Sequence, residues 1–204
     1  MSNLIVDFDG TIADSLPTVI KLFYEWSGAE PFSQAQIEEM RNMSLRDVLK
    51  MVGVPIWQVP KLLITARKDF NKYLKDIQVF DGMPETLKQL SKSGHKLFLI
   101  SSNSPQNIRQ FLSTHAIEDL FDGIQGNMAL FGKSSAMKTV MRKNKTSPGN
   151  WYAIGDETRD IDAAKKTGII SIAVDWGYNG RKILEQHQPD HLVSKPSEIL
   201  KLVQ

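Results

Sequence analysis

The sequence predicts an α/β fold in which a doubly wound, mostly parallel, Rossmann-like sheet is interrupted after its first strand by a helical insertion. Short apolar runs that end in Asp, Ser or Gly recur along the chain, and stretches with helical spacing separate them. Such alternation of strand and helix is typical of a doubly wound sheet. Residues 16–79 break the alternation, because they show helical periodicity and no convincing strand.

Four apolar runs have the length and composition of buried parallel strands, which are apolar on both faces. They are residues 4–6, 96–100, 151–154 and 169–174. Between the first two, residues 83–93 place Leu87 and Leu90 on one helical face, and Gly94 follows as a stop signal. Predicted strands and helices therefore alternate along this part of the chain.

The insertion shows amphipathic spacing at residues 22–26, 45–52 and 62–74. Turn signals mark its edges, with Pro17 on one side and the sequence FDGMP on the other. We therefore predict two parts: an α/β core made of residues 1–15 and 80–204, and a small all-helical domain made of residues 16–79.

Composition excludes several classes of protein. With 204 residues, 41% hydrophobic and 24% charged, the chain has room for one globular core and a modest elaboration. The formal charge of +2 is too balanced for a nucleic-acid surface. The absence of cysteine excludes disulfides, thiolate zinc sites and cysteine nucleophiles. The sequence shows neither a secretory signal nor a membrane-spanning stretch, so we expect a cytoplasmic protein without membrane association.

Two carboxylates follow the first predicted strand. Asp7 and Asp9 are two residues apart, so they point to the same side at a strand's carboxyl end, where open α/β sheets bind ligands. A phosphate in the same pocket would add a third negative group, and a cation such as Mg²⁺ would be needed to offset it. The alternative is a turn in which Asp9 and Thr11 merely cap backbone amides.

Two further polar groups fit a phosphate site. The strand at residues 96–100 runs into hydroxyl and amide side chains suited to phosphate oxygens, namely Ser101, Ser102 and Asn103. Lys133 precedes a helical stretch, where its ammonium would offset the charge of a phosphoryl group and of Asp7. A capped helix start before Pro105 and a solvated lysine are the alternatives.

A second acidic pair follows the strand at residues 151–154. Asp156 and Asp160 are one helical turn apart. Compensation of a helix dipole would also explain acids at a helix start. That alternative does not explain why successive strands all end in polar groups.

Together these elements resemble the haloacid dehalogenase superfamily, and in particular its phosphoglycolate phosphatase-like members. Motif one corresponds to DFDGTIADS, motif two to Ser101, motif three to Lys133 and motif four to GDETRDIDAAKKTGI. The segments VFDGMPETLKQLSKSG and ISIAVDWGYN also resemble parts of those proteins, so the likeness covers nearly the whole chain. Ser134 and Ser135 replace a proline-containing segment of many relatives, which puts the local loop path and the substrate preference in question.

The resemblance implies a magnesium-dependent phosphoric monoester hydrolase. Asp7 would be the nucleophile that forms an aspartyl-phosphate, and Asp9 the general acid and base. Mg²⁺ would be held by the carboxylates of Asp7 and Asp156 and by the backbone carbonyl of Asp9, with Asp160 supporting these ligands. An aspartate at position 9 separates phosphatases from the dehalogenases of the superfamily. The residues that would position or grip the phosphoryl group are Thr11, Ser101, Ser102, Asn103 and Lys133.

The resemblance also implies that the insertion is a cap that closes over the site, which favours a small phosphorylated metabolite as substrate. Arg41 and Arg46 lie in the insertion, where either would pair with a substrate carboxylate or second phosphate, or would be solvated. We expect a monomer or a homodimer.

Three other functions compete with this interpretation. A phosphomutase of the same superfamily would pass the phosphoryl group to a sugar phosphate. A signalling receiver domain also phosphorylates a strand-end aspartate, but receivers are shorter and lack the insertion. A non-catalytic phosphate-binding module would keep the fold without the activity.

Overall fold

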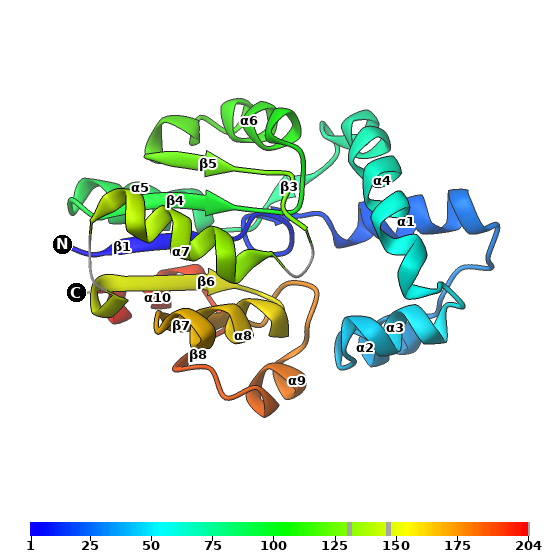
Figure 1. The fold of residues 1–204 in the computed structure, drawn as a ribbon. Helices are drawn as coiled ribbons and strands as arrows, with labels where there is room; N and C mark the ends of the chain where they lie inside the picture. Colours follow the sequence, from blue (N-terminus) through cyan, green and yellow to red (C-terminus); the bar gives the residue numbers. More distant parts are fainter. Residues whose placement is uncertain (130–131, 146–147, 204) are drawn as a thin grey trace.

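A computed structural model describes residues 1–129, 132–145 and 148–203, and within them a six-stranded, fully parallel sheet forms the centre of the molecule (Figure 1). Its strand order is β5-β4-β1-β6-β7-β8. The strands are β1 (Asn3–Val6), β4 (Lys96–Ile100), β5 (Gly123–Gln125), β6 (Trp151–Gly155), β7 (Ile170–Val174) and β8 (His191–Val193). The predicted α/β fold class is confirmed.

Alternate residues of the three central strands enter two apolar clusters, one on each face of the sheet. Side chains of one cluster are Leu4, Val6, Leu97, Leu99, Tyr152 and Ile154, and those of the other are Ile5, Phe98, Ile100, Trp151 and Ala153. The first cluster packs against helices α5 (Met83–Lys92), α6 (Pro105–Thr114) and α10 (Pro196–Leu202). The second packs against α7 (Lys133–Asn144) and α8 (Thr158–Thr167). Helices thus cover both faces, as a doubly wound sheet requires.

The predicted insertion is helical. It contains α1 (Leu16–Ser27), α2 (Gln34–Arg41), α3 (Leu45–Met51), the 3₁₀ turn η1 (Ile56–Gln58) and α4 (Val59–Tyr73). Figure 1 shows this α1–α4 segment beyond the end of the sheet to which the strand arrows point. Leu22 of α1 and Phe70 of α4 join the first apolar cluster, so the base of the segment packs on the core.

Two short strands join the segment to the sheet domain. β2 (Ala13–Asp14) pairs antiparallel with β3 (Gln78–Val79), so the chain enters and leaves the α1–α4 segment side by side. The expectation that residues 16–79 contain no strand is therefore wrong at its last two residues. Local sequence does not predict this pairing, because the whole α1–α4 segment separates the two strands along the chain.

The remaining elements are short. They are α9 (Arg181–Gln186), η2 (Glu118–Leu120) and η3 (Pro148–Asn150). No single helix in the described part of the chain is long and apolar enough to cross a membrane. Only the pair Leu45–Met51 and Ile56–Tyr73 passes that test when taken together, and it is bent by 105°.

Candidate active site

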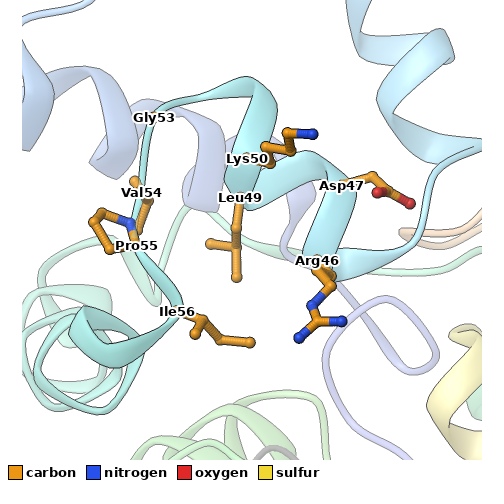
Figure 2. Close-up of a pocket in the computed structure, with 8 residues that line it drawn as sticks. All are labelled: Arg46, Asp47, Leu49, Lys50, Gly53, Val54, Pro55 and Ile56. Atoms are coloured by element: carbon orange, nitrogen blue, oxygen red, sulfur yellow. The ribbon is translucent and has the colours of Figure 1, made fainter.

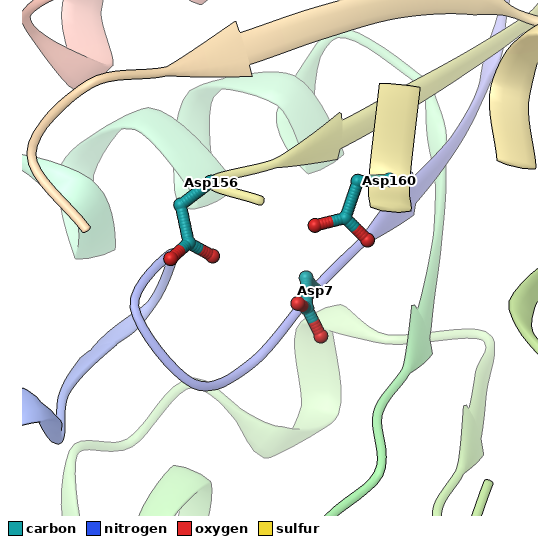
Figure 3. Close-up of side chains that lie close together, drawn as sticks. All are labelled: Asp7, Asp156 and Asp160. Carbon is teal, nitrogen blue, oxygen red and sulfur yellow. The ribbon is translucent and has the colours of Figure 1, made fainter. Parts of the chain in front are cut away.

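Three carboxylates from different parts of the chain converge at the carboxyl edge of the sheet. Asp7 follows β1, Asp156 follows β6, and Asp160 lies in the first turn of α8. Each offers an oxygen within 4.8 Å of the oxygens offered by the other two (Figure 3). All three side chains are buried. Strands β1 and β6 are direct neighbours, and this adjacency brings residues 149 positions apart into one cluster.

Lys133 is the cation of this cluster. The residue is only 3% exposed, and its ammonium donates hydrogen bonds to the carboxylates of Asp7 and Asp160. Burial alone would lower the pKa of Lys133, but these two carboxylates raise it, so the side chain stays protonated. The first turn of α7 therefore delivers a positive charge to the nucleophile position that the sequence predicted.

Asp156 is held by donors from two other loops. The Thr11 hydroxyl donates to Oδ1 at 2.8 Å, and the backbone amide of Tyr178 donates to Oδ2 at 2.7 Å. A Cβ added to Gly10, which has φ +77°, would lie 2.1 Å from Asp156 Oδ2, and one added to Gly177 would lie 2.3 Å from the same atom. The backbones of both loops can approach the carboxylate only because these positions are glycine.

Asp9 lies beside the cluster and faces different partners. Its carboxylate accepts a hydrogen bond from Ser15 Oγ at 3.0 Å and from Asn103 Nδ2 at 3.2–3.3 Å. The hydroxyls of Ser15 and Tyr178 are 2.9 Å apart. Since Ser15 gives its proton to Asp9, the Tyr178 hydroxyl donates to Ser15. Sequence reasoning did not find Ser15 or Tyr178.

Burial perturbs the acids of the site. It raises the pKa of Asp7 to about 7, with Lys133 opposing the rise and Asp160 adding to it. Burial also raises the pKa of Asp9, although Ser15 and Asn103 oppose this by bonding the carboxylate. The pKa of Asp156 lies well above its usual range because of burial and of repulsion from neighbouring carboxylates, Glu157 first among them. Perturbed acids gathered at one sheet edge mark a functional site.

Glu157 and Arg159 add a second charge pair at the start of α8. Their side chains form an ion pair, and both are largely buried. Burial would lower the pKa of Arg159, but Glu157 and Asp160 raise it. This pair could not be predicted from the sequence, because charged residues in a first helical turn are usually solvated.

The polar segment after β4 is ordered by its own hydrogen bonds. The Asn103 backbone amide donates to Ser101 Oγ at 2.9 Å, and Ser101 is buried. Arg67 of α4 donates from Nε to the carbonyl of Ser102 at 2.6 Å and from its Nη2 to the carbonyl of Met128 at 3.0 Å. The α1–α4 segment is thus tied directly to the segment that follows β4.

Arg41 makes a similar connection on the other side of the site. Its Nε donates to the carbonyl of Gly177 at 3.1 Å and its Nη2 to that of Asp175 at 2.9 Å, while Nη1 pairs with Glu38. These contacts anchor α2 to the loop after β7. The guanidinium that the sequence offered for substrate recognition is therefore engaged with the core.

Arg46 is placed differently. It lines a concavity of about 490 Å³ formed by α3 and the loop that follows it. Figure 2 shows Arg46 and Leu49 pointing into the space beside Ile56, whereas Lys50 points away. Among the described residues Arg46 has no hydrogen-bond or ion-pair partner.

The donor set fits a hard divalent cation. Lys133 pairs with only two of the three buried carboxylates, Asp7 and Asp160, and repulsion among the acids contributes to the raised pKa values of Asp7 and Asp156. A cation bound by these oxygens would relieve that repulsion, and carboxylate oxygens are the protein ligands that Mg²⁺ prefers. The cluster is therefore consistent with a magnesium site.

Comparison with known proteins agrees with this geometry. Residues 4–174 match the haloacid dehalogenase-like hydrolase family. The chain is 34% identical over 206 residues to the phosphoglycolate phosphatase of Synechococcus elongatus, covering 100% of this chain and 97% of that protein. It is 21% identical over 211 residues to a pyrophosphatase of Bacillus mycoides, covering 100% and 97%.

Solved structures share the fold. A predicted phosphatase from Clostridium acetobutylicum superposes with a TM-score of 0.81 at 20% identity, covering 99% of this chain and 97% of that one. A predicted phosphoglycolate phosphatase from Haemophilus somnus gives a TM-score of 0.76 at 21% identity, covering 100% and 98%. Together with the family match and the carboxylate cluster at the sheet edge, these likenesses place the chain in the haloacid dehalogenase-like hydrolase family, as a phosphoglycolate phosphatase-like member with a helical segment after its first strand.

Proposed function

We propose that the protein is a magnesium-dependent phosphatase that hydrolyses a small phosphorylated metabolite through an aspartyl-phosphate on Asp7. The observation that carries the proposal is the position of Asp7. Asp7 directly follows β1, and its carboxylate pairs with Lys133 and lies in one buried cluster with Asp156 and Asp160. This is the arrangement that an in-line attack on a phosphoryl group needs.

In the first step an Asp7 oxygen attacks phosphorus, and the bond from phosphorus to the ester oxygen breaks. Asp9 gives its proton to that leaving oxygen, and its raised pKa suits it to carry one. In the second step water attacks the phosphorus of the aspartyl-phosphate, Asp9 takes the proton, and Asp7 is released. The products are an alcohol and inorganic phosphate.

Other residues of the chain hold and charge-balance the phosphoryl group. Ser101, Ser102 and Asn103 offer hydroxyl and amide groups beside it, and Lys133 offsets its negative charge. Asp7 and Asp156 would hold Mg²⁺ together with the Asp9 carbonyl, and Asp160 keeps Lys133 in place. When bound, Mg²⁺ would neutralise charge on the phosphoryl oxygens.

We also propose that residues 16–79 form a cap over the site and that Arg46 recognises a second negative charge on the substrate. Phosphoglycolate and pyrophosphate, the compounds that name the two relatives above, both carry such a charge. Arg46 lines a concavity of the proposed cap and pairs with none of the described residues, which supports this role over Arg41. Bidentate pairing with carboxylate or phosphate suits arginine.

Substitution of the nucleophile tests the mechanism. Asp7→Asn has nearly the same shape but cannot attack phosphorus, so phosphate release from p-nitrophenyl phosphate should fall by at least about 10³-fold. The measurement is inorganic phosphate in the presence of Mg²⁺, and a chelator should abolish the wild-type activity. Steady release by the wild type also separates a phosphatase from a phosphomutase.

Asp76→Asn is the matched control, because it makes the same substitution at an exposed carboxylate. It should behave like the wild type. Retained turnover in Asp7→Asn, or full wild-type activity in chelator, contradicts the proposal.

A further inference from the structure

Asn107 is a buried amide outside every motif that the sequence showed. It lies on α6 and is 2% exposed. Its Nδ2 donates to Asn103 Oδ1 at 2.9 Å and to the backbone carbonyl of Arg67 at 2.8 Å, and its Oδ1 accepts from Asn71 Nδ2 at 3.1 Å. A buried amide with all these contacts is fixed in one orientation, because the Arg67 carbonyl can only accept.

The contact with Asn103 leads directly to the proposed general acid. Asn103 Oδ1 also accepts from the backbone amide of Ser104 at 2.8 Å, so the oxygen of this amide faces two donors. Its Nδ2 must then point the other way, toward Asp9, where it lies 3.3 and 3.2 Å from the two carboxylate oxygens. The orientation of Asn107 therefore helps to set the orientation of the group that holds Asp9.

We infer that Asn107 is a positioning residue for Asp9, acting through Asn103 and itself held by helix α4. The inference rests on the proposed function, since it needs Asp9 to protonate the leaving oxygen. Asn107 touches neither Asp7 nor Lys133 among its described contacts, so it should leave the nucleophilic attack unchanged. Its removal should most affect the step in which the aim of the Asp9 carboxyl matters, beyond any loss that both esters share through the proposed contact of Asn103 with the phosphoryl group.

The leaving group reveals that difference. Phenol, like the tyrosine side chain, holds its proton up to about pH 10, so phenyl phosphate needs an acid to protonate its departing oxygen. In p-nitrophenyl phosphate the nitro group stabilises the departing anion, and the acid matters much less. The two esters have nearly the same shape, so contacts with the cap largely cancel in their comparison.

The experiment measures kcat/KM for both esters in the wild type and in Asn107→Ala. This constant reports the first phosphoryl transfer, in which the leaving group departs. We expect the ratio of phenyl to p-nitrophenyl phosphate to fall by about 10-fold or more, since general acids contribute about 10²–10⁴-fold. The ratio does not depend on the fraction of protein that is folded. Asn107→Ser gives a second variant of smaller structural effect.

Gln110→Ala is the matched control. Gln110 lies one turn along α6 and also accepts from Asn71 of α4, but it has no contact with Asn103 in the described structure. Its ratio should stay within about twofold of the wild type. Asn103→Ala should lower the ratio as Asn107→Ala does, and the double variant should add little more.

Equal losses on both esters in Asn107→Ala and Asn107→Ser would overturn the inference, because they would show a residue that only supports the fold. A wild type that hydrolyses neither ester would instead contradict the proposed function. The two failures are therefore distinguishable.

Discussion

Asp156 depends on Thr11 for its orientation. The Thr11 hydroxyl is fully buried and donates to Asp156 Oδ1 at 2.8 Å. Thr11→Val keeps the shape but removes the donor, so the carboxylate loses one of the two partners that aim it. Loss of such a supporting hydrogen bond typically costs about 10–100-fold in metal affinity or activity. We expect the Mg²⁺ concentration for half-maximal activity to rise accordingly, as measured by a magnesium titration of phosphate release.

Thr86→Val is the control for this substitution. Thr86 is also buried, but its hydroxyl donates to the carbonyl of Gly82, the residue that precedes α5, away from the site. Its magnesium titration should match the wild type even if the protein is less stable. An unchanged titration in Thr11→Val would mean that Tyr178 alone suffices to hold Asp156.

The site divides into residues that the sequence could predict and residues that it could not. The carboxyl ends of parallel strands meet at one edge of a sheet. Strand ends precede Asp7 and Asp156, and Lys133 begins a helix, so their convergence could be predicted from the order of the elements along the chain. Asn107 and Arg67 belong to helices whose polar residues have ordinary solvated explanations. Their roles depend on how α4 packs against α6, which no local pattern specifies.

Two loops meet backbone to backbone beside the carboxylate cluster. A Cβ on Gly177, in the loop after β7, would lie 2.2 Å from the carbonyl oxygen of Gly10 and 2.3 Å from Asp156 Oδ2. Gly177→Ala must therefore push the loop outward and take the Tyr178 amide away from Asp156. We expect a loss of about 1–3 kcal/mol in the free energy of unfolding from overpacking. Activity should fall more than the lost stability explains, as measured by kcat and denaturant unfolding together.

Gly149→Ala makes the same change where no atom of the described residues lies within 4 Å of the added Cβ. Activity should be unaffected there. If Gly177→Ala retained wild-type kcat, the loop after β7 would not be needed to hold the site.

The helices and strands that were not predicted from the sequence have few buried apolar residues. Helix α2 has no buried residue. Its one sequence signal is the capping box, in which Ser33 and Gln36 bond each other's backbone. Strands β5 and β8 are three residues long and largely half-buried at the two edges of the sheet. The strands with continuous buried runs, β4 and β6 among them, were predictable because both of their faces are covered.

The gathering of buried acids makes the stability of the metal-free molecule depend on pH. The pKa of Asp7 rises from 3.8 to about 7 on folding, and that of Asp156 also rises. Between these pH values the folded chain holds protons that the unfolded chain has released. The free energy of unfolding must then fall as pH rises through this window, by up to a few kcal/mol. Asp190 has a lowered pKa, so its contribution is lost only at lower pH.

Thermal unfolding at about pH 5 and about pH 7.5, in chelator and in Mg²⁺, tests this expectation. In chelator the midpoint should fall at the higher pH. In the proposed site Mg²⁺ would bind the deprotonated carboxylates, so it should raise the midpoint much more at the higher pH than at the lower. The pKa of His95 is lowered, so His95 makes the free energy of unfolding rise with pH, opposite to the effect of Asp7. Because Asp7→Asn keeps His95, comparing this variant with the wild type isolates the contribution of Asp7. In chelator, the unfolding midpoint of Asp7→Asn should fall less with rising pH than the midpoint of the wild type. Equal pH dependence in the two proteins would show that Asp7 is already ionised in the metal-free fold.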